Sequence, residues 1–206
     1  MLKIKKYSLY FNFKNDNRYV QGPDIFDKVM KVIANDFDPY QLKELKFSAH
    51  EMLLSNADLV ITDEYIKKKN DKINSIITFR QEEKKYFAIV SQNKNKNKNK
   101  IKNKYSEENI KSQSKIIKDT IYFKNNLSNS LSEIVTSMNK YFLQQTVNQS
   151  VKWIVTKLEY YKLIEKKEII DKLITLKLIN NLNNKLTKSA IFLDKKKVGY
   201  VFFSQI

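Results

Sequence analysis

The sequence predicts an α+β fold in which one domain plan occurs twice. The first observation is a repeated hairpin pattern, with two β-rich runs around a charged turn: SIITFRQEEKKYFAIVSQ at 75–92 and KSAIFLDKKKVGYVFFSQ at 188–205. A shift of 113 positions superposes the two stretches without a gap, so that Phe79 falls on Phe192. Apolar residues at a period of two are typical of half-buried strands. The repeat therefore predicts two domains that each close with a hairpin.

The second observation is that the same order of elements precedes each hairpin. In the first half the predicted elements are a strand at 3–14, a helix from Gly22 to about Asp38-Pro39, and strands at 43–54 and 58–62. In the second half they are a strand at 120–125 (TIYFKN, matching SLYFNF), a helix over about 128–144, and strands at 150–158 and 168–179. Each half is thus predicted as a strand, one helix and an antiparallel run of strands.

The start of the first helix is the best-marked boundary in the sequence. Gly22 can occupy the cap, Pro23 suits the first helical position because it lacks an N–H, and Asp24 suits the positive end of the helix dipole. An apolar stripe follows at helical spacing. Its members are Ile25, Phe26, Val29, Val32 and Ile33.

The third observation is a low-complexity segment between the halves, built on NKNKNKNKIKNK. It has too few apolar residues to offset the entropy of ordering, which predicts a disordered Lys/Asn-rich linker at 93–116. The predicted domains are accordingly 1–92 and 117–206. Halves of this size bury only a modest share of their surface, so we expect them to pack on each other as a pseudo-dimer, and further homo-oligomers are compatible with this plan.

Composition excludes several kinds of chemistry. The chain has no cysteine and one histidine, His50, so we predict no disulfide, no metal site and no bound cofactor. The first residues alternate between apolar and polar, unlike a signal peptide, and no run of 18 apolar residues occurs. We therefore expect a cytoplasmic protein without membrane insertion.

One early helix followed by a meander of antiparallel strands resembles the hotdog superfamily, in which a curved antiparallel sheet wraps one central helix. The second half, from SVKWIVTKLEYY to KVGYVFF, and the YVQGPDIFDKVM stretch of the first half carry this resemblance. It implies tandem hotdog-like domains, the double-hotdog arrangement of thioesterases and dehydratases. A tandem ferredoxin-like fold or a saddle like that of the TATA-binding protein is the alternative, although a saddle would need a second helix in each repeat.

The resemblance also implies a ligand and a site. Hotdog enzymes bind acyl thioesters on CoA or acyl carrier protein, as in fatty acid or polyketide metabolism, and use a carboxylate near the start of the helix, where backbone N–H groups polarise the thioester carbonyl. The matching carboxylates are Asp24, Asp27 and, in the preceding loop, Asp16; the matching substrate-binding residues are Gln21, Gly22 and His50. The helix stripe predicts that Asp27 points away from the sheet, and the second half has no equivalent glycine.

The predicted function is therefore acyl-thioester binding, as a thioesterase, a dehydratase-like enzyme or a relic that only binds. Dehydratases need a histidine near the first strand, and this chain has none there. The alternative is a nucleic-acid-binding module, since the net charge is +17 and Tyr7, Tyr10, Phe11 and Phe13 stand among lysines as in a stacking platform. Drift toward lysine and asparagine also explains this charge.

Overall fold

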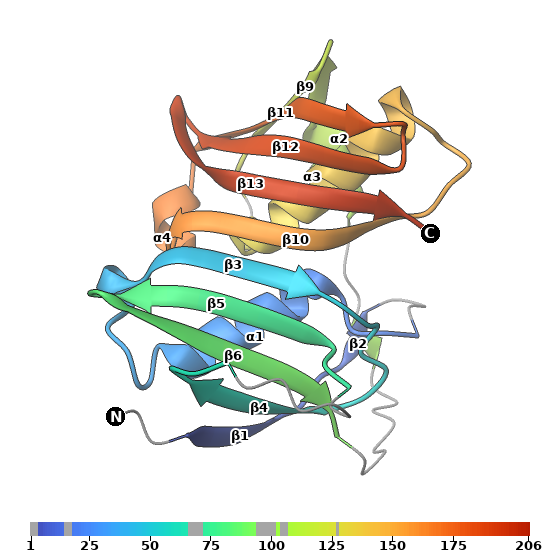
Figure 1. Ribbon diagram of the computed structural model, residues 1–206. Coiled ribbons are helices and arrows are strands. Elements are labelled where there is room, and N and C mark those ends of the chain that lie inside the picture. Colours follow the sequence, from blue (N-terminus) through green and yellow to red (C-terminus); the bar gives the residue numbers. More distant parts are fainter. Residues whose placement is uncertain (1–3, 15–17, 66–71, 94–101, 104–106, 127) are drawn as a thin grey trace. The chain divides into compact units, whose positions relative to one another are not determined.

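The computed structural model describes residues 4–14, 18–65, 72–93, 102–103, 107–126 and 128–206. The chain divides into two compact units, Met1–Tyr105 and Ser106–Ile206. Each unit has an antiparallel sheet with one long helix across one of its faces (Figure 1). Among the described residues, no helix combines the length and apolar character needed to cross a membrane.

The first unit contains a five-stranded antiparallel sheet in the order β1-β4-β6-β5-β3. Its described elements are β1 (Lys5–Leu9), β2 (Phe13–Lys14), α1 (Gly22–Ile33), the 3-10 helix η1 (Pro39–Gln41), β3 (Lys43–Ala49), β4 (Ala57–Thr62), β5 (Ser75–Gln81), β6 (Lys84–Gln92) and β7 (Lys102–Asn103). The short strands β2 and β7 pair in parallel.

The second unit contains a six-stranded antiparallel sheet in the order β10-β13-β12-β11-β9-β8. Its described elements are α2 (Glu108–Gln113), β8 (Lys115–Ile117), β9 (Thr120–Lys124), α3 (Leu131–Thr146), β10 (Trp153–Lys162), α4 (Lys166–Ile169), β11 (Leu173–Leu182), β12 (Leu186–Leu193) and β13 (Lys196–Gln205). In each unit a long helix is preceded by a strand of the sheet and followed by four further strands of that sheet, as predicted, and the α+β prediction is confirmed.

The two sheets differ in which strand of the repeated hairpin lies next to the preceding strand of the chain. In the first unit β6 lies between β4 and β5, so the second strand of the hairpin is next to the preceding strand of the chain. In the second unit β12, the first strand of the hairpin, occupies that place next to β11 (Figure 1). The repeat seen in the sequence therefore produces the same elements in both units but not the same strand order.

The gapless superposition of the two hairpins also needs correction. The turns are closed by the pairs Gln81–Lys84 and Leu193–Lys196, which are offset by 112 positions. In β13 one extra residue, Val198, forms a bulge between two pairs of the ladder, and the offset beyond it becomes 113. The sequence match was thus correct for β13 beyond the bulge but wrong by one residue for β12.

Helix α1 buries four of the five residues of the predicted stripe, Ile25, Phe26, Val29 and Ile33, whereas Val32 is half-buried and Met30 is buried in addition. Its start differs slightly from the prediction, because Gln21 has the extended backbone of an N-cap while Gly22 is already the first helical residue. Pro23 is tolerated one position later, since the first four N–H groups of a helix have no intrahelical acceptor. The helix starts one residue earlier than the proline suggested.

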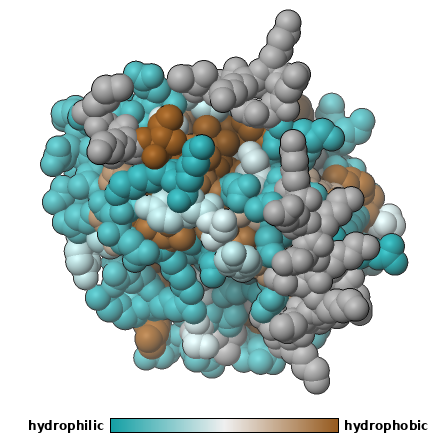
Figure 2. All heavy atoms as spheres, turned by 90° about the horizontal axis from the view of Figure 1, so that it is seen from below, coloured by the Kyte–Doolittle hydropathy of each residue, from teal (hydrophilic) through white to brown (hydrophobic). Residues whose placement is uncertain are grey.

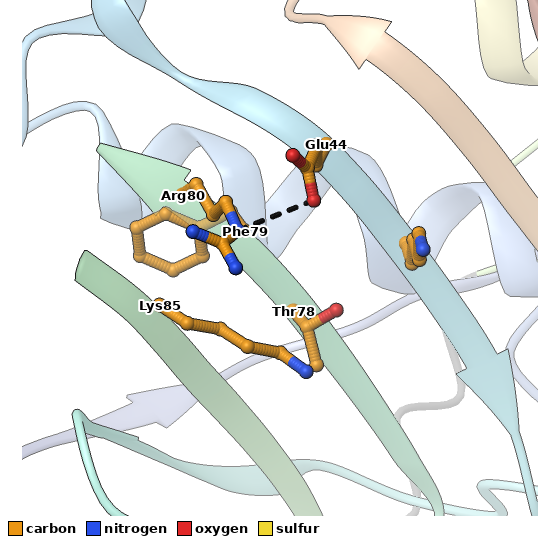
Figure 3. A pocket seen from close by; sticks show the side chains of 6 residues that line it. Glu44, Thr78, Phe79, Arg80 and Lys85 are labelled. Atoms are coloured by element: carbon orange, nitrogen blue, oxygen red, sulfur yellow. Dashed lines mark ion pairs between the residues drawn. The ribbon is translucent and has the colours of Figure 1, made fainter. Parts of the chain in front are cut away.

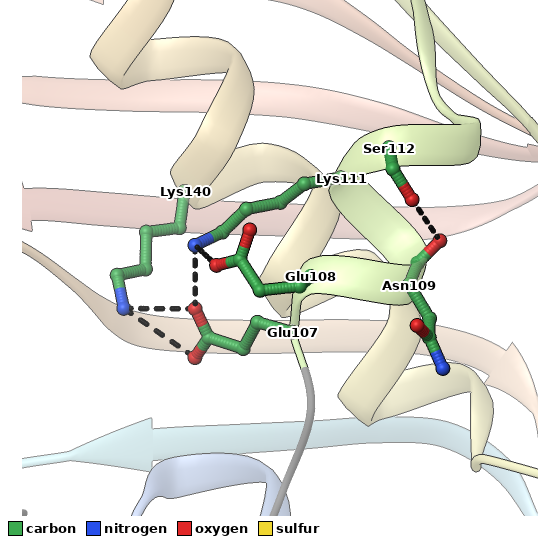
Figure 4. A network of polar contacts seen from close by, with 6 residues as sticks. All are labelled: Glu107, Glu108, Asn109, Lys111, Ser112 and Lys140. Carbon is green, nitrogen blue, oxygen red and sulfur yellow. Dashed lines mark hydrogen bonds and ion pairs between the residues drawn. The ribbon is translucent and has the colours of Figure 1, made fainter.

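Part of the predicted linker is structured. Helix α2 packs on α3 and fully buries Ile110, and Glu107 just before α2 accepts a hydrogen bond from Lys140 of α3 at 3.1 Å (Figure 4). One buried isoleucine and this ion pair suffice to hold a short helix that composition alone assigned to disorder. Residues 94–101 and 104–106, the core of the predicted linker, lie outside the described residues.

Several strand boundaries also differ from the prediction, and the strand predicted at 3–14 is divided into β1 and β2. The strand predicted at 43–54 ends at Ala49, and the strand predicted at 168–179 begins at Leu173, because Lys166–Ile169 form the short helix α4. The Glu165 and Glu168 side chains cap α4 reciprocally, a pattern that favours a helical turn over a strand. The packing of the two halves as a pseudo-dimer and the formation of oligomers stay predictions.

Candidate functional site

The start of α1 lies beside the loop that follows β3. The backbone N–H of Val20 donates to the Leu53 carbonyl at 2.8 Å, which fixes the segment before α1 against the segment after β3. Gln21 then caps the helix without a side-chain hydrogen bond to the first turn, and its carbonyl accepts the first helical bond, from Ile25, at 3.2 Å. This bridge brings the loops that carry Gln21 and His50 into one region of the first unit.

Asp24, in the first turn of α1, forms an ion pair with Lys14 of β2. The Lys14 Nζ lies 2.5 Å from Asp24 Oδ1, and both side chains are mostly buried, with exposed fractions of 14% and 17%. A partly buried ion pair of this length favours the charged carboxylate. Asp24 is therefore held in place as an anion next to the positive end of α1.

Asp27 lies one turn further along α1 and is half-buried. It is not among the buried residues of α1, and the direction in which its carboxylate points stays a prediction. Asp16, the third predicted carboxylate, lies outside the described residues.

His50 is exposed directly after the end of β3. Its backbone N–H donates to the Asn74 carbonyl at 2.8 Å, and the structure records no side-chain contact between His50 and either Asp24 or Asp27. Within the described residues, a histidine–aspartate pair is thus absent from the start of α1.

The corresponding helix of the second unit begins differently. The Ser130 Oγ accepts a hydrogen bond from the Glu133 backbone N–H at 3.2 Å, and the Glu133 carboxylate accepts one from the Ser130 N–H at 2.9 Å. This capping box occupies the start of α3 with the chain's own side chains. The start of α1 has no such box.

Three buried asparagines organise the loops around these helices, and sequence reasoning missed all of them. The Asn56 Oδ1 accepts from the Phe11 N–H at 2.9 Å, and the Asn125 Nδ2 donates to the Ile169 carbonyl at 2.8 Å. Asn74 bonds through both side-chain atoms, donating to Met52 and accepting from Gln92. Asparagine is abundant in the sequence, so the sequence alone did not indicate which asparagines are buried.

The four aromatic residues named for the alternative, a stacking platform, differ in exposure. Phe11 is buried, its exposed fraction being 6%, and the Tyr7 hydroxyl donates a hydrogen bond to the Asp36 carboxylate. Of the four aromatic residues only Tyr10 is strongly exposed, at 67%. Tyr7 and Phe13 are half-buried, so the four rings do not form one exposed surface, and nucleic-acid binding stays a prediction.

The outer surface offers one small polar pocket in the first unit, with a volume of about 60 Å³. Arg80 and Glu44 form an ion pair of 3.2 Å at its rim, with Lys85 and Thr78 beside them (Figure 3). This volume is too small for an acyl chain. The surface seen from below in Figure 2 is mostly hydrophilic, with smaller hydrophobic areas.

Comparison with known proteins identifies the fold. No protein-family model matches the sequence, and no curated protein matches it. A candidate thioesterase II from Thermobifida fusca YX superposes with a TM-score of 0.58 at 9% identity, covering 98% of this chain and 92% of that chain. The dehydratase domain of PpsC from Mycobacterium tuberculosis, in complex with C12:1-CoA, gives 0.53 at 8% identity, with 98% and 93% covered.

A third similar structure is the dehydratase domain from the CurJ module of the curacin polyketide synthase, with a TM-score of 0.52 at 11% identity and coverage of 100% and 93%. The chain therefore has the predicted hotdog fold, and the match extends over both units. At these identities the similarity establishes the fold alone.

Proposed function

We propose that the protein binds an acyl thioester, carried by CoA or by an acyl carrier protein, at the start of α1, and hydrolyses it. The fold supports this proposal, because the similar structures are thioesterases and dehydratases and one of them was solved with an acyl-CoA. We also propose that the two units act as a double hotdog in which only the first carries a working site.

The observation that carries the proposal is the contrast between the two long helices. Ser130 and Glu133 cap α3, whereas Gln21 leaves the start of α1 without a side-chain cap. A helix start is suited to binding a partial negative charge, because its N–H groups and dipole point there. In this proposal the Gly22 N–H binds the thioester oxygen, and Pro23, which has no N–H, leaves that donor isolated.

The two carboxylates near the start of α1 have different roles in this proposal. Asp24 is held as an anion by Lys14 and fixes β2 against the helix, so we assign it a positioning role. Asp27 acts as the general base: it takes a proton from water while the water oxygen adds to the thioester carbonyl carbon. The C–S bond then breaks, the thiol leaves with that proton, and the free acid remains.

Hydrolysis fits the described residues better than dehydration. Dehydration of a β-hydroxyacyl group needs a base and an acid on the same substrate, which dehydratases supply with a histidine and a carboxylate. His50, the only histidine in the chain, is exposed and makes no recorded contact with Asp24 or Asp27.

A thermal-shift series tests binding. Short, medium and long acyl-CoAs are compared with free CoA and with the matching acyl-N-acetylcysteamine thioesters, which have no nucleotide. A ligand at about 100 times its Kd stabilises the folded state by about 2.7 kcal/mol. We expect the increase in Tm to grow with acyl length in both series. An increase in Tm that does not depend on acyl length in either series would refute the proposed site.

Hydrolysis assays with variants test the assignments. We expect Asp27→Asn to lose turnover by about 100-fold or more while acyl-CoA still raises its Tm. Asp24→Asn should weaken binding and turnover together. Ser130→Ala is the matched control at the start of α3 and should leave both unchanged. Normal turnover in Asp27→Asn would exclude it as the base, and binding without turnover in the unmodified protein would identify a protein that only binds.

A further inference from the structure

A groove with a volume of about 620 Å³ lies at one end of the second unit's sheet. This volume falls within the range of small-molecule sites. The end of β10, helix α4, the start of β11 and the turn between β12 and β13 form its walls. The lining residues are Tyr161, Lys162, Ile164, Glu168, Lys172, Leu193, Asp194, Lys195, Lys196, Lys197 and Val198.

The walls of the groove are tied together by hydrogen bonds. The Asp194 N–H donates to the Leu173 carbonyl at 2.7 Å, and the Asp194 carboxylate accepts from the Leu173 N–H at 3.1 Å. These bonds hold the β12–β13 turn against the start of β11. On the opposite wall, Glu168 accepts from the Glu165 N–H at 2.9 Å and from Lys162 at 2.8 Å, which fixes α4 to the end of β10.

The groove keeps a positive charge after its internal ion pairs are counted. Glu168 pairs with Lys162 and Asp194 pairs with Lys172, at 2.8 and 3.0 Å. Hydrogen bonds from Lys172 and the Leu173 backbone lower the pKa of Asp194, so this acid is charged at neutral pH. The remaining three lysines come from the β12–β13 turn, and no acidic partner is recorded for them within the described residues. They are Lys195, Lys196 and Lys197.

The floor of the groove is apolar and includes one aromatic ring. Ile164, Leu193 and Val198 line it together with Tyr161, whose exposed fraction is 46%. Val198, the bulge residue of β13, is one of the residues that line the groove. The groove therefore combines three cations with apolar side chains and one aromatic ring.

We propose that this groove binds a phosphorylated nucleotide, with its phosphate at Lys195 and Lys196 and its base against Tyr161 and Ile164. Phosphate is attracted by unpaired ammonium groups, and a base gains from contact with an aromatic ring. Neither requirement involves α1 or a thioester, so the proposal does not depend on the proposed function. A free nucleotide and the nucleotide part of CoA have the chemistry that this groove would recognise.

A single mononucleotide fits the observations better than a nucleic-acid strand laid across the open face of the sheet. The two rings that continue this face along β13 are covered by lysines: Lys188 Nζ lies 4.1 Å from the Tyr200 ring centroid, and Lys157 Nζ lies 5.0 Å from that of Phe202. A base could stack there only after displacing these cation–π contacts. Lys197 Nζ also lies over the Tyr161 ring, but at 6.0 Å from its centroid, so Tyr161 is less closely covered by a lysine than Tyr200 and Phe202.

Calorimetric titration of the full chain with 3′,5′-ADP tests the proposal. We expect binding that the Lys195→Ala/Lys196→Ala variant weakens at least about tenfold, equivalent to about 1.4 kcal/mol. The matched control is Lys84→Ala/Lys85→Ala, which removes the same charge after the corresponding turn in the first unit and should leave the affinity unchanged. Equal losses in the two variants would show general charge attraction and would overturn the proposal, as would no detectable binding.

Further arms identify what the groove recognises. Tyr161→Ala should weaken 3′,5′-ADP but not inorganic pyrophosphate, and Tyr161→Phe should restore the nucleotide affinity. An oligonucleotide that binds far more tightly than 3′,5′-ADP, with affinity rising with its length, would overturn the mononucleotide in favour of a strand. CoA binding as tightly as 3′,5′-ADP would identify the cofactor's nucleotide as the source, and the acyl-N-acetylcysteamine series reports on the α1 site separately.

Discussion

The Gly199 backbone lies against the backbone carbonyl of Glu159, so closely that a Cβ added to Gly199 would lie 1.9 Å from the Glu159 oxygen. Gly199 pairs with Tyr160 of β10 immediately after the bulge at Val198. The chain has only two glycines, and this one permits a close approach of two strands that no other residue allows.

Gly199→Ala should therefore separate β10 from β13 and lower the free energy of unfolding by about 1–3 kcal/mol or more. Urea denaturation measures this change. Gly22→Ala is the control, because Gly22 does not have a positive φ and alanine is favourable at a helix start. Equal stability of the Gly199→Ala variant and the unmodified protein would mean that the strands move apart without cost.

Asn74 connects three segments of the first unit. Its Nδ2 donates to the Met52 carbonyl at 3.0 Å, its Oδ1 accepts from the Gln92 N–H at 2.6 Å, and its backbone carbonyl accepts from the His50 N–H. Asn74→Ala removes both side-chain hydrogen bonds, which are part-buried, and should cost about 1–3 kcal/mol at about 0.5–1.5 kcal/mol for each bond. The exposed Asn180→Ala on β11 should cost far less in the same measurement.

The strands of the repeated hairpin could be predicted from the sequence, but their order in the sheet could not. The alternation of apolar residues predicted the strands of both units, and the stripe Ile25–Ile33 predicted the face that α1 buries. The order of β5 and β6 in the sheet could not be predicted. Both strands alternate apolar and polar residues in the same way, so either of them could pair with β4. Which strand lies next to β4 depends on the path of the chain between β4 and β5, and apolar periodicity contains no information about that path.

The candidate site was predicted less completely than the fold. The start of α1 could be predicted because a helix start has a local signal in glycine, proline and acidic residues, whereas the roles of Gly22 and Asp24 stay proposals. The Lys14–Asp24 pair and the groove at Lys195–Lys197 join segments distant in the sequence. In a chain with 39 lysines and arginines, no local pattern distinguishes Lys14 or Lys195–Lys197 from the other lysines.

The Asp36 carboxylate predicts how stability depends on pH. Burial alone would raise the pKa of Asp36, but hydrogen bonds from Lys5 and Tyr7 outweigh it and lower that pKa. A carboxyl group with a lowered pKa in the folded state stabilises above its unfolded pKa of about 3.9, and this contribution is lost as the pH falls through the folded pKa. Asp36→Asn should therefore be less stable than the unmodified protein at neutral pH.

Denaturant unfolding between neutral pH and about pH 2 measures the difference between the two proteins. The difference should be constant above about pH 5 and should shrink in more acidic solution. Asp171→Asn is the control, since Asp171 is exposed and asparagine tolerates its left-handed backbone, with φ of 59°. A difference between Asp36→Asn and the unmodified protein that persists unchanged to the lowest pH would contradict this assignment.

Asn139 and Asn125 are both fully buried in the second unit and differ in one respect. The Asn125 amide donates to the Ile169 carbonyl at 2.8 Å, whereas neither side-chain atom of Asn139 has a hydrogen-bond partner within the described residues. A buried amide without partners lowers stability by the cost of removing it from water. Leucine has nearly the same shape as asparagine and favours a helix such as α3.

Asn139→Leu should therefore raise the free energy of unfolding by about 1–2 kcal/mol. Asn125→Leu, the matched substitution at the satisfied position, should lower it by about 1–3 kcal/mol, because the Ile169 carbonyl then loses its donor. Both changes are measured by denaturant unfolding of the full chain. A loss of stability in Asn139→Leu as large as that in Asn125→Leu would show that the Asn139 amide is satisfied in solution, by an ordered water bound inside the second unit.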